Sequence, residues 1–524
     1  MRTLLLTAGI FLLLAIPLSS GAVPVPSDPV VLDSGPVQGL QANGVRRYLG
    51  IPYAAPPVGE LRWRPPQPAA PWTEPRQAMA FGPACPQGGP LENAGNEDCL
   101  FLNVWAPVRE KGEPLPVMVW IHGGGFNFGS ASMEEYEGSR LARLGVVVVS
   151  LNYRLGPLGF LVHPKLAAGG TAALPANYGL QDQMTALAWV GRNIAAFGGD
   201  PGRVTLFGQS AGSRSVALLT LSPAARGLFQ QAIAQSGGPI IGSEYLTPAF
   251  DGDPQHAAAM GRELGARLGC DKAPDAAACL RAIPAKRVIA AADCRTGLFD
   301  EGLFFAPVFD GQVLPRDPAA ALADDTWPRV PMILGSTGNE GSAYLRGETG
   351  LDREKYATFL KVRFGGRADE AARLFPAVTD ADVAPAIDRC VTVAVNAQPA
   401  RLMARSLSGA HAKAFLYRFT RRPDTARARE LGAFHGVDLA YVFGRTEAGD
   451  GYTDVDRELS RQMMAYWVHF AKTGDPNGPG LPPWPVFEAG SDWNLNFADT
   501  VRAEQHLYRA QCDFIDQVSR FRPK

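Results

Sequence analysis

The stretch "GRVTLFGQSAGSRS", residues 202–215, decides the fold because an apolar run, a turn of small residues and a helical run follow one another in it. The run Val204–Phe207 predicts a buried strand, and the residues after Ser210 predict a helix. Gly208 and Gly212 stand two positions either side of the serine, where larger side chains would collide in so sharp a turn. The pattern therefore predicts that Ser210 is raised at the carboxyl end of a strand.

Two interpretations of Ser210 compete at this point. Gly-x-Ser-x-Gly also occurs by chance in glycine-rich connections, where the serine is only a small residue in a turn. The flanking strand and helix favour a catalytic nucleophile, because free N–H groups at a helix N-terminus stabilise developing negative charge.

Further segments alternate between strand and helix patterns. The segment Gln181–Phe197 has apolar residues at helical spacing, and a long helical insertion is expected over residues 245–300. The order strand, helix, strand predicts an α/β fold with a mostly parallel central sheet flanked by helices. The other predicted strands lie within residues 115–125, 144–154, 230–237 and 329–336.

The stretch "HGGGF", residues 122–126, follows one of these strands and predicts an oxyanion hole. Side chains at Gly124 or Gly125 would keep a substrate carbonyl from reaching backbone N–H groups. A tight turn after an edge strand is the alternative, but it explains one or two glycines better than three in a row.

A serine nucleophile also needs a base and an acid. Among the seven histidines, His435 stands out because small residues surround it in "GAFHGVDLAYVFG". A lone histidine is more often structural than catalytic, so we use the order nucleophile, acid, base that is usual after such a turn. Glu340 is the preferred acid because it follows a predicted strand through a short loop; Asp388 and Asp310 remain alternatives, and Asp310 more readily supports a turn.

Composition limits the class of protein and of partner. The chain has 524 residues, of which 46% are hydrophobic and 19% charged, and no low-complexity linker or repeat divides it. One large domain with insertions is therefore expected. The formal net charge of −1 gives no electrostatic footprint for nucleic acid or an anionic membrane, which favours a neutral small molecule as the partner.

The N-terminus is typical of a secretory signal peptide. Arg2 precedes an apolar stretch, Leu4–Ile16, and then small residues that fit cleavage after Ala22. A membrane anchor is the alternative, but the stretch is shorter than the ~20 residues of a spanning helix. We predict a signal peptide over residues 1–22, a single domain over 23–524 and export to the periplasm or the medium.

Seven cysteines in an exported chain predict disulfides. The spacings favour two short loops, closed by Cys85 with Cys99 and by Cys270 with Cys279. Pairing of Cys390 with Cys512 is a weaker third expectation, which would leave Cys294 free. No pair of cysteines or histidines stands at zinc-ligand spacing, so neither a metal nor another cofactor is expected.

With these residues identified, the chain resembles the type-B carboxylesterase/cholinesterase family of α/β-hydrolases, in particular a secreted carboxylesterase of the bacterial type. The likeness runs over nearly the whole mature chain. It is carried, in the family's order, by "YLGIPYAAPPVGELRWRPPQP" (48–68), "NEDCLFLNVWAP" (96–107), "HGGGF" (122–126), "LNYRLGPLGFL" (151–161), "NYGLQDQMTALAWV" (177–190), "FGGDPGRVTLFGQSAG" (197–212) and "AKTGDPN" (471–477).

The resemblance implies an α/β-hydrolase fold with helical insertions that form a gorge or cap. It implies Ser210 as nucleophile, Glu340 as acid and His435 as base. The remaining implied features are an oxyanion hole from the N–H groups of Gly124, Gly125 and Ala211, the disulfides Cys85–Cys99 and Cys270–Cys279, and the structural ion pairs Arg62–Glu97 and Arg154–Asp182.

Three departures from the family bear on the substrate. Gln209 stands where cholinesterases often have glutamate, and the loop between Cys85 and Cys99 lacks the tryptophan that binds choline by cation–π contact. A choline-selective site is therefore not expected. Leu303, in "EGLFFAP", stands where some members have an aromatic ring, which predicts room for acyl groups larger than acetyl.

The sequence thus predicts a serine hydrolase that cleaves a small carboxylic ester through an acyl-enzyme on Ser210. An amide, carbamate or thioester hydrolase is an alternative, because the same triad serves these leaving groups. A non-catalytic adhesion protein is a second alternative, although such members typically replace the nucleophile, which is present here.

Overall fold

The computed structural model describes residues 23–91, 95–110, 112–167, 174–239, 253–294, 298–299, 302–323, 327–410, 412–447 and 450–518. The predicted signal peptide, residues 1–22, lies outside the described residues. No helix in the described ranges is long and apolar enough to cross a membrane.

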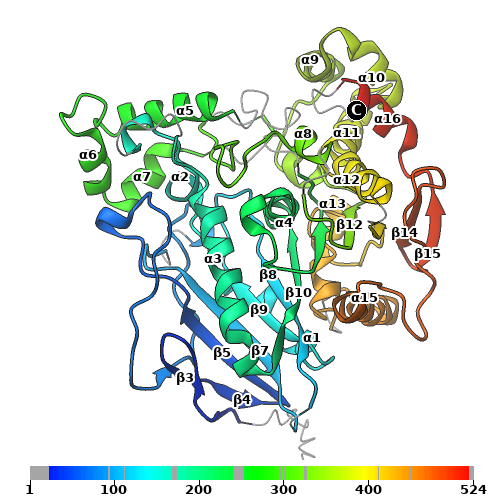
Figure 1. Ribbon diagram of the computed structural model, residues 1–524. Helices are drawn as coiled ribbons and strands as arrows, with labels where there is room; N and C mark the ends of the chain where they lie inside the picture. Colours follow the sequence, from blue (N-terminus) through cyan, green and yellow to red (C-terminus); the bar gives the residue numbers. More distant parts are fainter. Residues whose placement is uncertain are drawn as a thin grey trace, which may run out of the picture.

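A twelve-stranded sheet forms the centre of the molecule (Figure 1). Its strands, in spatial order, are β1 (Val25–Pro26), β4 (Leu40–Ala42), β5 (Val45–Pro52), β7 (Phe101–Pro107), β9 (Val147–Leu151), β8 (Leu115–Ile121), β10 (Gly199–Gln209), β11 (Gln231–Gln235), β12 (Met332–Thr337), β13 (Ala414–Phe419), β14 (Trp493–Phe497) and β15 (Arg502–Gln505). A small second sheet joins β2 (Val30–Val31), β3 (Pro36–Gln38) and β6 (Arg76–Gln77).

The seven strands from β9 to β14 run parallel, and the strands toward both edges pair antiparallel. Strands β8 and β9 are apolar almost throughout because both faces of the parallel part are covered. The predicted α/β class with a mostly parallel sheet is confirmed. Strand β10 begins earlier than the run Val204–Phe207 indicated, since it pairs with β8 from Gly199.

Helices cover the sheet and connect its strands. They are α1 (Ser139–Ala142), α2 (Gly156–Phe160), α3 (Tyr178–Asn193), α4 (Ala211–Leu221), α5 (Pro254–Arg267), α6 (Ala276–Ala282), α7 (Ala285–Ala292), α8 (Pro318–Leu322), α9 (Arg353–Phe364), α10 (Ala368–Leu374), α11 (Val383–Val391), α12 (Gln398–Gly409), α13 (Ala426–Leu431), α14 (Leu439–Val442), α15 (Asp454–Thr473) and α16 (Arg509–Val518). A π-helix, η11 (Thr392–Ala397), joins α11 to α12.

The two faces of the sheet bury two separate apolar cores. Along β8, Val117 and Val119 join the core that α3, α4 and α12 cover, whereas Met118 and Trp120 join the core beneath α1, α14 and α15. Figure 1 shows α3 and α15 on opposite sides of the strands. This packing fixes β10 in the middle of the molecule and leaves its carboxyl end to form a site.

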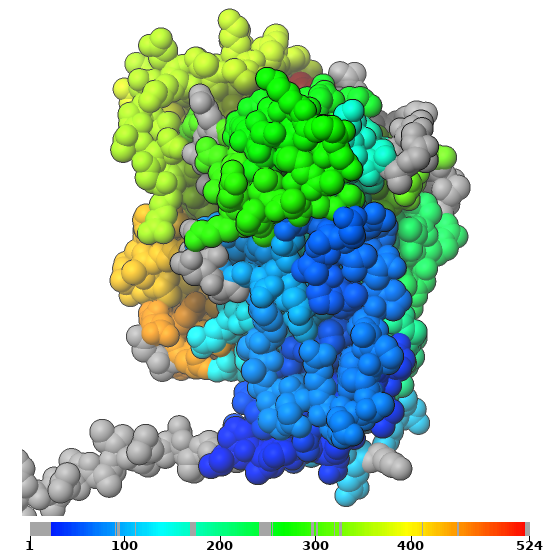
Figure 2. Space-filling model, turned by 90° about the vertical axis from the view of Figure 1, so that its left-hand side faces the viewer, coloured from blue at the N-terminus to red at the C-terminus, as the bar shows by residue number. Residues whose placement is uncertain are grey.

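The predicted helical insertion is confirmed as α5–α7. Figure 2 shows this green segment seated above the blue N-terminal part of the chain. Helix α7 packs against α2, and the Arg62 guanidinium donates to the carbonyl oxygen of Ile283 just after α6. The insertion is thus fastened to the N-terminal part beside the carboxyl ends of the strands.

Two of the three disulfide expectations are confirmed. Cys85 is bonded to Cys99, and Cys270 to Cys279. The expected pairing of Cys390 with Cys512 is wrong, because both are free thiols. They lie on α11 and α16, which pack into one apolar cluster without bonding the sulfur atoms. Burial raises the pKa of each thiol to about 12, which makes both unreactive.

The two ion pairs implied by the resemblance are present. Arg62 contacts Glu97 at 2.5 Å, and Arg154 contacts Asp182 at 2.7 Å with both side chains buried. Arg154 also donates to the carbonyl oxygen of Arg64. Both pairs join distant segments, and none of the four residues is among those that line the cavity described below, which is consistent with a structural role.

Candidate active site

Ser210 occupies the turn between β10 and α4 in a strained backbone conformation. Its φ is 59° and its ψ −123°, outside the regions that L-residues favour. A Cβ on Gly208 would lie 2.6 Å from the backbone of Gly212, and one on Gly212 would lie 2.1 Å from the carbonyl oxygen of Ile121. The small residues that flank the serine are therefore required by the turn, as the sequence indicated.

The structure brings Glu340 and His435 together, although 95 residues separate them. Nδ1 of His435 is hydrogen-bonded to Oε2 of Glu340, whose carboxylate is fully buried. The other carboxylate oxygen accepts from the backbone N–H of Thr337 at 2.6 Å, and the N–H of Glu340 donates to Thr392 Oγ1 at 3.0 Å. The carboxylate is thus fixed at both oxygens and orients the imidazole.

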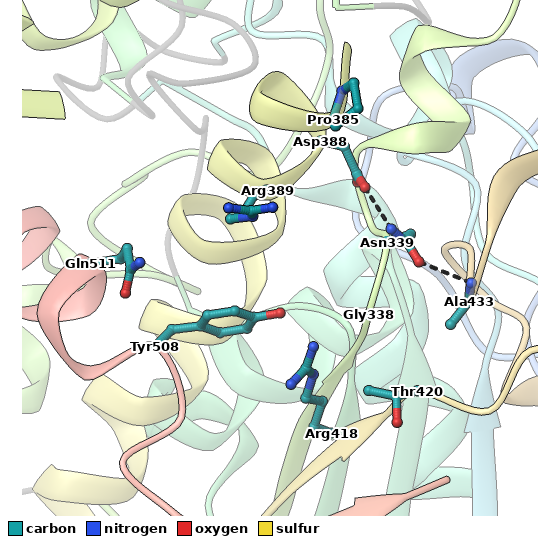
Figure 3. Close-up of a pocket in the computed structure, with 10 residues that line it drawn as sticks. All are labelled: Gly338, Asn339, Pro385, Asp388, Arg389, Arg418, Thr420, Ala433, Tyr508 and Gln511. Atoms are coloured by element: carbon teal, nitrogen blue, oxygen red, sulfur yellow. Dashed lines mark hydrogen bonds between the residues drawn. The ribbon is translucent and has the colours of Figure 1, made fainter. Parts of the chain in front are cut away.

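A single asparagine connects the loops that carry the acid and the base (Figure 3). The side chain of Asn339 donates to Asp388 at 2.7 Å and accepts from the N–H of Ala433 at 3.0 Å. The N–H of Asn339 in turn donates to the carbonyl oxygen of Ala433 at 2.9 Å. Because Asn339 precedes Glu340 and Ala433 lies two residues before His435, these bonds set the distance between acid and base.

The alternative acids have other roles. Asp388 accepts from the backbone N–H groups of Gly341 and Ser342, so it anchors the loop of Glu340 from outside the cavity. Asp310 accepts from the N–H groups of Gln312 and Leu314 and supports a turn, as expected. Of the three candidates, Glu340 is the one in contact with His435.

The remaining ring nitrogen of His435 is contacted by Gln209. Nε2 of Gln209 lies 3.1 Å from Nε2 of His435, while Ser210 Oγ makes no hydrogen bond to a described residue. When Nδ1 carries the proton, Nε2 is the one acceptor of the imidazole, and the side-chain amide of Gln209 donates to it. The sequence assigned Gln209 to substrate binding; the structure places its side chain in the cavity and on the imidazole.

Backbone N–H groups in the glycine loop after β8 and at the start of α4 have no acceptor among the described residues. The N–H groups of Gly124, Gly125 and Ala211 make no hydrogen bond within the described ranges of the chain. A Cβ on Gly123 would lie 3.0 Å from Cβ of Ser210, and one on Gly124, at φ 109°, would lie 2.0 Å from the carbonyl oxygen of Phe128. Glycine is therefore required for the close approach of this loop.

Buried residues hold the glycine loop from behind. The ring of His122 stacks on Tyr153 with centroids 4.5 Å apart, and Nδ1 of His122 lies 2.8 Å from the carbonyl oxygen of Gly123. Gln87, within the loop closed by the disulfide of Cys85, bonds both the N–H and the carbonyl of Gly129. The loop is thus tied at both ends.

Burial lowers the pKa of His122 from 6.5 to about 4, so this histidine is neutral at pH 7. The unfolded chain takes up the proton near pH 6.5 and the folded chain only near pH 4. The free energy of unfolding should therefore fall by about 3 kcal/mol from this residue as the pH drops through that window. Urea unfolding of the protein and of His122→Phe at pH 7 and pH 4 measures the difference; equal pH dependence in both would contradict it.

Ser210, His435 and the glycine loop line one cavity of about 430 Å³. Other lining side chains come from several distant segments of the chain and include Phe128, Arg214, Ser236, Phe304, Tyr344, Asn396, Arg427 and Phe434. Its described wall has no residue from α5–α7. Residues of α4, η11, α13 and α14 contribute to this wall together with loop residues.

The expected role of Leu303 does not hold. Leu303 is buried and forms an isolated backbone β-bridge with Cys294. Its neighbour Phe304 lines the cavity. A wider acyl pocket was inferred from the sequence because Leu303 is aliphatic where some family members have an aromatic ring. Because an aromatic ring lines this part of the wall, that inference loses its basis.

The fold and this site match one known family. Residues 26–515 match the model of the carboxylesterase family. The chain belongs to this family. It is 37% identical to fumonisin B1 esterase of Sphingopyxis macrogoltabida, over 90% of this chain and 88% of that protein, and 36% identical to para-nitrobenzyl esterase of Bacillus subtilis, over 87% and 92%.

Solved structures agree with the sequence relatives. A PNB esterase structure superposes with a TM-score of 0.80 at 34% identity and covers 93% of this chain and 99% of its own. The expected α/β-hydrolase fold is confirmed, and the carboxylesterase described here is a hydrolase of carboxylic esters.

Several site residues of this carboxylesterase escaped the sequence reasoning. Asn339 and Thr392 position the acid, and Gln87 positions the glycine loop, through side-chain bonds to backbone atoms. Such bonds leave no periodic pattern in a sequence. Arg214 is a charged residue just after the small-residue turn, and no role was assigned to it from the sequence.

Proposed function

We propose that Ser210, His435 and Glu340 form the catalytic triad of this carboxylesterase and that ester cleavage proceeds through an acyl-enzyme. The proposal rests on the bond between His435 Nδ1 and Glu340 Oε2 in the cavity that also receives Ser210. A carboxylate that fixes the imidazole tautomer leaves Nε2 free to take a proton, which is the arrangement a serine nucleophile requires.

In the first step His435 Nε2 removes the proton of Ser210 Oγ while the oxygen attacks the ester carbonyl. Gln209 has to release Nε2 for this step, and hydrogen bonds of resting catalytic groups often rearrange on substrate binding. The carbonyl oxygen becomes an oxyanion, which accepts hydrogen bonds from the N–H groups of Gly124, Gly125 and Ala211 in this mechanism.

The imidazolium then gives its proton to the leaving alkoxide, and the C–O bond breaks to leave the acyl group on Ser210. Water attacks the acyl-enzyme with His435 again as base, and the acid product leaves. Glu340 stays ionised throughout and stabilises the imidazolium.

The proposed substrate is a small ester without a preference for choline. Gln209 is uncharged and hydrogen-bonded to His435, so it offers no anionic partner for a quaternary ammonium group. We propose export as the location, because both short disulfides are formed and such bonds persist in oxidising compartments.

Gly125→Ala should lower kcat by about 10²–10³, the usual loss when one oxyanion donor is displaced. A Cβ here meets no atom within 4 Å, but φ is 59°, so the backbone has to rotate and its N–H turns away. Gly227→Ala is a matched control, with φ 82° and open space around its Cβ but no place in the cavity. Equal kcat losses in the two variants would show that Gly125 N–H is not a donor.

Intact-mass analysis after reaction with an aryl phosphonate tests the proposed nucleophile. One adduct per chain should form, and peptide mapping should locate it on Ser210. Active enzyme that stays unlabelled, or an adduct on another serine, would overturn the proposal.

A further inference from the structure

Arg214 brings an unpaired cation into the catalytic cavity. It lies on the first turn of α4, and its backbone N–H donates to the carbonyl oxygen of Ser210 at 3.0 Å. Its guanidinium makes no hydrogen bond or ion pair with the part of the chain that the structure describes. The ionisable groups that act on it are the Tyr344 phenol and the Glu340 carboxylate, and both oxygens of Glu340 are already bonded to Thr337 and His435.

Two further donors in the same cavity lack partners. Ser236 is 1% exposed and Asn396 is 2% exposed, yet Oγ of the serine and Nδ2 of the asparagine bond no described atom. A buried donor without a partner costs about 1–3 kcal/mol, so two such donors beside one cavity are expected to bind water or a ligand there.

Both donors lie on irregular backbone. Ser236 has a φ of 57° at the end of β11, and Asn396 lies in the π-helix η11. Strained residues and π-helical turns cluster at functional sites. The positive φ of Ser236 and the π-helix of Asn396 lie in different segments, and both residues line the same cavity.

Contacts between the three segments place them side by side. Ser213 Oγ, beside Arg214, donates to the carbonyl oxygen of Gly237 at 2.9 Å, which places the end of β11 against α4. A Cβ on Gly238 would lie 2.4 Å from Pro399, which places the same segment against the helix that continues η11. The segment of Ser236 therefore lies between the other two.

We propose that Arg214, Ser236 and Asn396 form a subsite for a carboxylate carried by the ester substrate. The planar guanidinium can bind both carboxylate oxygens, and the hydroxyl and amide satisfy their remaining lone pairs. The subsite rests on the proposed function, since it recognises the substrate of the same serine. It changes the expected substrate from a neutral ester to one with a free carboxylate. That carboxylate belongs either to the acyl part, as in the monoester of a dicarboxylic acid, or to the alcohol part, as when a hydroxy acid supplies the alcohol.

Other charged groups on the described cavity wall do not compete for this role. Glu135 is an anion beside the Tyr136 hydroxyl, and Arg427 is exposed to solvent and stacks over Phe434 at 4.5 Å. Burial lowers the pKa of Arg214, and a bound carboxylate would oppose that shift. Arg214 is therefore the cation with most to gain from an anionic ligand.

Paired substrates test the subsite. The para-nitrophenyl monoester of adipic acid is compared with an ester of the same shape in which an isopropyl group replaces the free carboxylate. The wild-type protein should have the higher kcat/KM with the monoester, and Arg214→Met should lower the ratio of the two kcat/KM values by about 10–100-fold, as expected for a charge-assisted bidentate contact. Arg214→Lys should recover part of the ratio.

Arg192→Met is the matched control, because this exposed arginine pairs with Asp33 outside the cavity, and it should leave the ratio unchanged. A second substrate pair, para-carboxyphenyl acetate and para-isopropylphenyl acetate, carries the same difference on the alcohol side. The pair that responds to Arg214→Met assigns the subsite to the acyl or the alcohol part of the ester.

Failure of the subsite and failure of the proposed function give different results. A wild-type protein that cleaves the uncharged esters without preferring a charged one would overturn the subsite and leave the serine hydrolase mechanism intact. A protein that cleaves none of the four esters would contradict the mechanism itself. If Arg214→Met does not fold, Asn396→Leu should still lower the ratio several-fold, and an unchanged ratio would overturn the proposal.

Discussion

Ser210→Ala should lower kcat for a para-nitrophenyl ester by about 10⁶-fold, the loss typical of removing a triad serine. The oxyanion donors and the cavity remain in the variant, so a small rate above that of buffer should persist. Steady-state and long-time assays measure both quantities, and circular dichroism establishes that the variant is folded.

Ser213→Ala is the matched control for this experiment. Ser213 lies three residues further along α4, and its hydroxyl donates to the carbonyl oxygen of Gly237. Its loss removes one buried hydrogen bond, worth about 1 kcal/mol of stability, with kcat within a few-fold of wild type. If both variants lost activity equally, the effect of Ser210→Ala would be structural and not catalytic.

Glu340→Gln should lower kcat by about 10⁴-fold while the fold is kept. An amide can still contact His435 Nδ1, but it stabilises the wrong tautomer and leaves the imidazolium without a counter-charge. The Glu340 carboxylate is completely buried, and a neutral amide costs less free energy to bury than a charge. The free energy of unfolding should therefore fall much less than kcat.

Asp310→Asn provides the comparison, because Asp310 is also a buried carboxylate and remained an alternative acid on sequence grounds. Its oxygen accepts two backbone N–H groups in a turn, and an asparagine oxygen can accept the same bonds. Its kcat should stay near that of the wild type. A loss of similar size in Asp310→Asn and Glu340→Gln would remove the basis for assigning the acid.

The fold could be predicted because its decisive signals are local. The runs that became β8 and β9 are apolar on both faces, and such runs fit only a sheet covered on both sides. The turn at Ser210 could be predicted for the same reason. Gly208 and Gly212 are required by contacts within a few residues or with the adjacent strand.

The parts that could not be predicted depend on distant contacts. Leu303 and Phe304 are adjacent, and only the packing of the surrounding loops decides which ring or side chain lines the cavity. Cys390 and Cys512 share a cluster, yet a shared cluster does not bring two sulfur atoms to bonding distance. The contact of Gln209 with His435 likewise joins residues 226 positions apart.

The bonds of Asn339 divide the site into two rigid parts. One part is the turn of Ser210, built into β10 and α4, and the other is the pair of loops that Asn339 fastens together around Glu340 and His435. Other residues of the cavity wall, such as Ser236 and Asn396, come from further segments of the chain. Substrate preference can therefore diverge by exchange of wall residues while the reaction itself is inherited unchanged.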